Sequence, residues 1–261
     1  MMPARRPLLV PYATGGITAG WTDYLRAYQD AGADALEIGL PFSDPMLDGA
    51  TIQRASDRAL ARGTTTATIL ADLARLDPGV PVIVMTYANL ALGTAGFARR
   101  LRDAGVSGLI VPDLPVDAIG ELDAGDLDVI LLAAPATPDD RLTRIAERTR
   151  GFLYAVSVMG TTGERAELAG TAATLAARAK ARTTLPVLIG FGVSTPAQAA
   201  AAGHAGDGVV IASALMRKVL DGATPARLGA EVAAYRAALD APVRQEVPPA
   251  TAHAEVSGHR R

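Results

Sequence analysis

Short apolar runs alternate with segments of helical period along nearly the whole chain. Runs rich in Val, Ile, Leu and Ala predict eight β-strands, at residues 8–13, 35–38, 82–86, 108–111, 128–133, 151–156, 186–190 and 208–211. The segments between them predict helices at residues 22–31, 51–62, 66–75, 96–104, 138–148, 169–181, 196–202 and 224–239. This repeated order of strand and helix indicates a parallel sheet built from successive βα units.

Two parallel architectures compete for this pattern. The predicted strands are apolar on both faces, which is typical of a parallel sheet covered on both sides. Eight units then favour an α/β fold of one domain, a closed (β/α)8 TIM barrel over residues 1–241. An open doubly wound sheet would carry a Gly-rich dinucleotide-binding turn after its first strand, and TGGITAG at 14–20 does not match that turn. Residues 242–261 contain three prolines and no periodicity, so we expect a disordered C-terminal tail.

Composition limits the partners and the location of the protein. With 49% hydrophobic residues, the 261-residue chain has enough apolar material for one large core. A formal net charge of −2 gives no reason to expect nucleic acid or a membrane surface as a partner. No apolar run approaches the roughly 20 residues of a membrane span, and residues 1–7 lack the apolar stretch of a signal peptide. The absence of cysteine fits a cytoplasmic location.

One acid lies inside an apolar run. Glu37 stands between Leu36 and Ile38 in the second predicted strand. A carboxylate buried among apolar side chains is costly to keep ionised without a partner, so a glutamate in a core strand points to chemistry. The structural alternative is a strand-edge glutamate that faces solvent. Asp48, in the segment after the same strand, is a second candidate acid.

In a barrel of this kind the carboxyl ends of the strands form the active site. Polar side chains stand at these points at Tyr12, Thr14, Glu37, Asp48, Tyr87, Asn89 and Asp113. After the sixth predicted strand comes SVMGTTGER at 157–165, a segment with two glycines. It is either a lid that closes over a substrate or a long flexible connector, and the sequence favours neither.

A phosphate site is indicated after the seventh and eighth predicted strands. The chain reads IGFGVS at 189–194 and IASA at 211–214, the latter before a short helix. Small residues let a phosphate approach backbone N–H groups, and a helix N-terminus adds a favourable partial charge. A tight left-handed turn is the alternative explanation for the first segment. Because both segments lie where barrels bind phosphate, we expect phosphate binding.

The residue types that are missing exclude several mechanisms. The three histidines lie in the predicted tail or in a helix-to-strand connection, so they form no metal cluster. The two lysines lie in helical segments, so an aldolase that forms a Schiff base lacks its amine. No nucleophile elbow with a Ser-His-Asp set is present. What remains is general acid–base catalysis by Glu37 and Asp48 on a phosphorylated substrate.

Five segments together closely resemble the alpha subunit of tryptophan synthase. They are EIGLPFSDPMLDGATIQ at 37–53, MTYAN at 85–89, VPDLP at 111–115, GTTG at 160–163 and GFG at 190–192. The resemblance covers about residues 8–240, and the first segment is highly specific. It implies a carbon–carbon lyase of tryptophan biosynthesis that cleaves indole-3-glycerol phosphate to indole and glyceraldehyde 3-phosphate by a retro-aldol step. No cofactor is implied.

The resemblance also implies roles for individual residues. Glu37 matches the catalytic glutamate of the family, and Asp48 matches its catalytic aspartate. A glutamate whose pKa is raised by apolar surroundings suits proton transfer, and an ionised aspartate suits stabilisation of a cationic indole ring. The positions that match the substrate pocket are Tyr12, Thr14, Met85, Tyr87, Ile110, Pro112, Tyr154 and the lid residue Thr162. Those that match the phosphate site are Gly163, Gly192, Ala212 and Ser213.

The chain departs from the family pattern at several points. Ile17 stands where an aspartate is common in the loop after the first strand, and Ala50 stands where the usual sequence is DGPTIQ. Ala212 replaces a usual glycine but still offers its N–H. Only residues 1–7 precede the first predicted strand, so we expect the N-terminal helix that commonly covers the barrel floor to be missing.

The resemblance implies a protein partner, a pyridoxal-phosphate beta subunit that consumes the indole in an α2β2-type complex. The loop that contains Pro41 and Asp44 would then face this subunit. Two alternatives stay open. Ile17 and the short N-terminal segment give some weight to a free-standing lyase that supplies indole to another pathway. The retention of both Glu37 and Asp48 argues against an idle phosphate-binding subunit.

Overall fold

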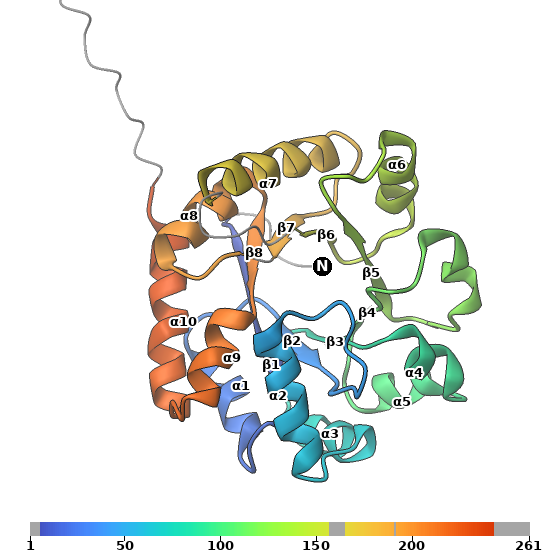
Figure 1. Ribbon diagram of the computed structural model, residues 1–261, viewed down its shortest axis with the longest axis vertical. Helices are drawn as coiled ribbons and strands as arrows, with labels where there is room; N and C mark the ends of the chain where they lie inside the picture. The colour runs from blue at the N-terminus through green and yellow to red at the C-terminus, as the bar shows by residue number, and fades with distance from the viewer. Residues whose placement is uncertain (1–5, 157–164, 191, 243–261) are drawn as a thin grey trace, which may run out of the picture.

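The computed structural model describes residues 6–156, 165–190 and 192–242. Eight parallel strands pair in chain order and close into a barrel, with helices around the outside (Figure 1). The (β/α)8 barrel predicted from the sequence is therefore confirmed. The strands are β1 (Leu8–Thr14), β2 (Leu36–Gly39), β3 (Val82–Met85), β4 (Gly108–Ile110), β5 (Asp128–Ala133), β6 (Leu153–Val156), β7 (Val187–Gly190) and β8 (Gly208–Ile211).

The predicted strands all match observed ones to within two residues at each end. The helices are α1 (Trp21–Asp30), α2 (Ala50–Ala61), α3 (Thr66–Leu73), α4 (Ala88–Gly93), α5 (Phe97–Asp103), the 3-10 helix η1 (Val116–Glu121), α6 (Asp139–Arg148), α7 (Arg165–Lys180), α8 (Pro196–Ala205), α9 (Ser213–Leu220) and α10 (Pro225–Asp240). The sequence did not predict α4 and η1, because each is too short to show a helical repeat. The expected tail lies almost wholly outside the described residues, and no described helix is long and apolar enough to cross a membrane.

Side chains alternate between the two faces of each strand, and this places the apolar residues in two layers. Ile83, Ile110 and Tyr154 belong to a cluster inside the barrel, whereas Leu36 and Ile38 belong to the layer between the strands and the helices. Successive side chains of a strand point to opposite faces. Glu37 therefore points into the barrel interior, and it is not the solvent-facing strand-edge glutamate that was the structural alternative.

An ion-pair cluster fixes the last helix at the amino ends of the strands. The Arg236 side chain of α10 is 8% exposed, and its guanidinium donates to Asp34 Oδ2 at 3.0 Å and to the Pro7 carbonyl at 2.9 Å. Asp34 Oδ2 also accepts from the Leu9 N–H at 2.8 Å, and Asp240 Oδ1 accepts from Arg236 at 2.7 Å. In Figure 1, α10 lies between α8 and α1 on the outside of the barrel, the helices it packs against.

Candidate active site

Glu37 is buried in the interior and is the second of the four residues of β2. It is 1% exposed and lies in register with Tyr12 on β1 and Ile83 on β3. Its Oε2 atom has no hydrogen-bond partner among the described residues. Burial, with a smaller contribution from the nearby Asp48 charge, raises the pKa of Glu37 from 4.5 to about 8. The Glu37 carboxyl is therefore largely protonated at neutral pH.

Asp48 lies in the loop between β2 and α2 and is half-buried. Burial raises its pKa to about 6, although the hydrogen bond with the Tyr87 side chain acts to lower it. Since a hydroxyl can donate to a carboxylate, this bond favours the ionised form. At neutral pH the site thus holds a neutral Glu37 beside an ionised Asp48. Two acids whose environments separate their pKa values are the pattern expected of distinct acid and base roles.

Tyr87 connects the β2–α2 loop to the end of β3. Its hydroxyl oxygen accepts a hydrogen bond from the Leu47 N–H at 3.1 Å, and its ring stacks on Phe42 with centroids 5.1 Å apart. Asp113, after β4, accepts from the Ala88 N–H at 2.8 Å and so holds the backbone next to Tyr87. Phe42 was not predicted as a site residue, because only the fold shows that it meets Tyr87.

Two tyrosine rings form the interior wall near Glu37. A Cβ atom at Gly39 would overlap the Tyr12 ring, and one at Gly190 would overlap the Tyr154 ring, so each glycine makes room for its tyrosine. Burial raises the pKa of both hydroxyls well above the ordinary value, so both stay neutral. Thr14 is fully buried, and its Oγ1 donates to the Tyr12 hydroxyl at 3.3 Å.

The other residues predicted for the substrate pocket lie at the same end of the barrel. Met85 ends β3 and is half-buried, Ile110 ends β4 and is fully buried, and Pro112 follows β4. Thr162 and Gly163 lie outside the described residues, so the choice between a lid and a connector at 157–165 stays open.

Residues 192–195, here called the phosphate loop, follow β7. Gly192 has φ +79°, a left-handed conformation that favours glycine. Gln198 Oε1 accepts from the N–H groups of Ser194 and Thr195 at 2.9 and 3.1 Å. The N–H groups of Gly192 and Val193 donate to nothing among the described residues. The left-handed turn considered from the sequence is thus present, and the N–H groups of Gly192 and Val193 stay without an acceptor among the described residues.

Helix α9 follows β8 directly, and β8 pairs with β7 up to Gly190 and Val210, so α9 and the phosphate loop follow the ends of two neighbouring strands. Ala212 is the N-cap and Ser213 is the first helical residue. Met216 Sδ accepts from the Thr14 N–H at 3.4 Å, which ties α9 to the end of β1. The two predicted phosphate segments therefore follow neighbouring strands at the same end of the barrel.

The β2–α2 loop and the neighbouring β1–α1 loop differ in exposure. Met46 and Leu47 are 81% and 53% exposed, and Asp44 is also exposed. Ile17, by contrast, is 1% exposed and belongs to the apolar core. An aspartate at position 17 would therefore lose hydration in this environment.

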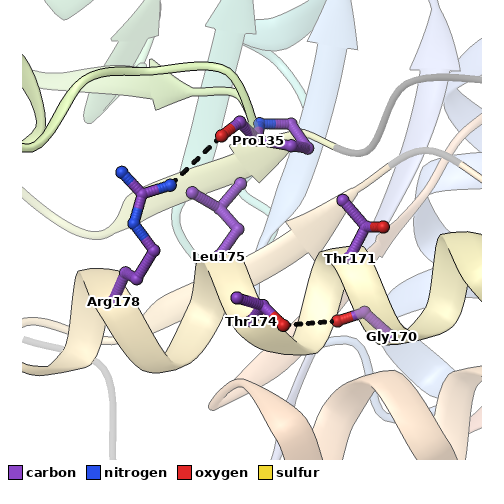
Figure 2. Close-up of a pocket in the computed structure, with 6 residues that line it drawn as sticks. All are labelled: Pro135, Gly170, Thr171, Thr174, Leu175 and Arg178. Carbon is purple, nitrogen blue, oxygen red and sulfur yellow. Dashed lines mark hydrogen bonds between the residues drawn. The ribbon is translucent and has the colours of Figure 1, made fainter.

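A separate hollow of about 390 Å³ lies between α7 and the loop after β5 (Figure 2). It is lined by Pro135, Gly170, Thr171, Thr174, Leu175 and Arg178. Arg178 donates to the carbonyls of Pro135 and Thr137 at 3.1 and 2.7 Å and pairs with Asp139 at 2.7 Å. None of the predicted site residues lines this hollow. The hydrogen bonds and the ion pair of Arg178 hold α7 against the loop after β5.

The fold and the site together define a class of protein. It is a (β/α)8 barrel enzyme with two carboxyl groups of different pKa at the carboxyl ends of its strands, suited to general acid–base chemistry.

Comparisons with known proteins place the chain within this class. The family model described as tryptophan synthase alpha chain matches residues 1–241. The tryptophan synthase alpha chain of Gloeobacter violaceus is 47% identical over 238 residues, which are 87% of this chain and 86% of the relative. That of Geobacter sulfurreducens is 41% identical over 244 residues, 90% of this chain and 92% of the relative.

Solved structures agree with the family match. A Mycobacterium tuberculosis tryptophan synthase structure has a TM-score of 0.82 and 36% identity, covering 91% of this chain and 94% of that one. A tryptophan synthase subunit alpha from Legionella pneumophila has a TM-score of 0.80 and 32% identity, covering 90% and 94%. The chain therefore belongs to the tryptophan synthase alpha chain family and is a carbon–carbon lyase of tryptophan biosynthesis.

Proposed function

We propose that Glu37 and Asp48 together cleave indole-3-glycerol phosphate into indole and glyceraldehyde 3-phosphate, Glu37 as the proton carrier and Asp48 as the fixed negative charge. The observation that carries the proposal is the separation of their pKa values, about 8 for Glu37 and about 6 for Asp48. At neutral pH the Glu37 carboxyl is protonated and can donate its proton, whereas Asp48 is ionised and carries a negative charge.

The reaction needs two proton transfers and one bond cleavage. First, the Glu37 carboxyl gives its proton to indole C3, which turns the ring into a cation with an acidic N–H. The ionised Asp48 accepts the hydrogen bond from this N–H and stabilises the positive charge. The bond from C3 to the glycerol carbon then breaks, and its electron pair returns to the ring. The hydroxyl proton on that carbon passes to the Glu37 carboxylate, which leaves an aldehyde and restores the protonated Glu37.

Neutral polar groups complete the proposed pocket. The Tyr12 hydroxyl is held by Thr14 in a position close to Glu37, and Tyr154 lies on the same interior wall. Both tyrosines keep their protons because burial raises their pKa, so neither brings a competing charge into the pocket. Met85, Ile110 and Pro112 supply the apolar surface against which an indole ring packs.

Backbone groups hold the phosphate in this proposal. The N–H groups of Gly192 and Val193 donate to no described residue, and we place the phosphate between them and the N-terminus of α9 at Ala212 and Ser213, where the helix dipole favours an anion. Arg217 lies about one helical turn beyond Ser213 and is exposed. Neutral donors therefore dominate this site, and we place Gly163 on its remaining side by resemblance to the family.

We also propose a beta subunit as the protein partner, docked on the β2–α2 loop that contains Pro41 and Asp44. Support comes from the likeness to the solved tryptophan synthase of Mycobacterium tuberculosis and from the exposed Met46 and Leu47, since exposed apolar side chains commonly mark interaction sites. A cytoplasmic location and the lack of a cofactor stay predictions.

The test of the catalytic roles is a single-turnover assay on Glu37→Gln, which keeps the shape of the side chain and removes the transferable proton. We expect a loss of at least about 10² to 10⁴-fold, the usual contribution of a general acid–base. Affinity for glycerol 3-phosphate, measured by calorimetry, stays unchanged because the phosphate groups are untouched. A variant that keeps more than roughly a tenth of the wild-type rate removes Glu37 from the mechanism.

A further inference from the structure

The phosphate loop is anchored from a helix that is distant in sequence. Tyr235 on α10 is 1% exposed, and its hydroxyl donates to the Ser194 carbonyl at 2.9 Å. The same helix is fixed one residue further on, where Arg236 pairs with the buried Asp34. The Tyr235 hydroxyl therefore connects a helix that is fixed by an ion pair to a loop that is proposed to bind substrate.

Ser194 is held on both of its peptide groups. Its N–H and its Oγ both donate to Gln198 Oε1 at 2.9 Å, and the neighbouring Thr195 N–H donates to the same atom at 3.1 Å. The Ser194 carbonyl is fixed from the other side by Tyr235. Two of the amides in the loop are thus already in use, which leaves those of Gly192 and Val193 for a ligand.

Fixing Ser194 matters because the loop contains Gly192, whose φ of +79° is a left-handed conformation. A glycine has more backbone freedom than any other residue, so a loop that depends on one loses much entropy when a ligand orders it. Groups that hold such a loop in its binding conformation reduce this loss and raise affinity. Gln198 belongs to the helix that the loop itself begins, whereas Tyr235 anchors the loop to a different part of the barrel wall.

We infer that Tyr235 is a positioning residue for the substrate phosphate, acting through the Ser194 carbonyl to hold the Gly192 and Val193 N–H groups in place. It touches no substrate atom in this role. The inference rests on the phosphate site proposed above, and it concerns binding, so its effect falls on KM more than on kcat.

Tyr24 provides a matched control. It is also buried, and its hydroxyl donates to a backbone carbonyl, that of Ala223, at 3.0 Å. Ala223 lies between α9 and α10, outside the phosphate loop. Tyr235→Phe and Tyr24→Phe each remove one hydroxyl-to-carbonyl hydrogen bond and keep the ring, so a purely structural role predicts the same small loss of thermal stability and the same substrate binding for both.

The experiment compares wild type, Tyr235→Phe and Tyr24→Phe by calorimetry with glycerol 3-phosphate and by steady-state kinetics with indole-3-glycerol phosphate. We expect Tyr235→Phe to weaken glycerol 3-phosphate binding and raise KM by about 3- to 10-fold, the effect of one lost hydrogen bond, with kcat changed less than about 2-fold. Tyr24→Phe keeps the wild-type values. Equal affinities for all three proteins overturn the inference.

Gly192→Asp separates this failure from failure of the site itself, because it places a like charge against the phosphate. If Gly192→Asp abolishes binding while Tyr235→Phe binds normally, the phosphate site stands and the role of Tyr235 is refuted. If Gly192→Asp binds as the wild type does, the site and the inference both fall.

Discussion

Glu37 should make the protein less stable as the pH rises, and Glu37→Gln should remove this effect. In the unfolded chain the Glu37 carboxyl titrates near its ordinary pKa of 4.5, whereas burial raises the pKa in the folded protein to about 8. Between these values the unfolded state has released a proton that the folded state still binds. The free energy of unfolding therefore falls with rising pH across this window, and Glu37 adds no further pH dependence below or above it.

The size of the effect follows from the shift. One pKa unit corresponds to about 1.36 kcal/mol, so the shift of Glu37 corresponds to about 4 to 5 kcal/mol between pH 4.5 and pH 8. A glutamine at this position cannot ionise. Any cost of burying its amide is the same at every pH, so it moves the stability curve of the variant without changing its slope.

The assay is urea denaturation of wild type and Glu37→Gln at half-unit steps from about pH 4.5 to pH 8.5. We expect the difference in unfolding free energy, variant minus wild type, to increase steadily by about 4 to 5 kcal/mol across the series. Asp48 titrates in both proteins, so its contribution largely cancels in the difference between their unfolding free energies. Parallel curves would show that Glu37 is already ionised in the folded protein, and the proton it is proposed to give to indole C3 would be absent.

Three further changes test other parts of the structure. Tyr87→Phe removes a donor to the Asp48 carboxylate, so the pKa of Asp48 rises above about 6 and the acid limb of the pH profile of kcat/KM moves to higher pH; an unmoved limb would exclude Tyr87 from this role. Asp48→Asn loses the charge and should cost about 3 to 4 kcal/mol in the single-turnover barrier, whereas Asp48→Glu should be milder; equal losses would indicate geometry rather than charge. Arg236→Met leaves the buried Asp34 with the half-exposed Arg6 as its one charged partner among the described residues, and should lower the unfolding free energy in urea by about 3 kcal/mol while kcat stays at the wild-type value.

The sequence predicts the strands well and singles out Glu37 as a buried acid, because both features are local. A parallel strand buried on both faces reads as a continuous apolar run, and Glu37 is conspicuous within one. The contacts of Tyr87 with Phe42 and of Tyr235 with Ser194 join residues from different βα units, and no periodicity reports such pairs. The short helix α4 is also missed, since its six residues carry less than two full turns of pattern.

The order in which the two acids ionise depends on which element of the barrel each one occupies. Glu37 is held on a strand whose backbone groups pair with β1 and β3, so its side chain meets the apolar interior and gains no donor at Oε2 among the described residues. Asp48 stands on a half-exposed loop, where the Tyr87 hydroxyl reaches it and water keeps part of its hydration. Exchanging the two residue types would not exchange their roles, because the interior position would still favour the protonated form. The separate proton-transfer and charge-stabilising roles proposed for Glu37 and Asp48 therefore arise from the positions that the fold gives these two residues.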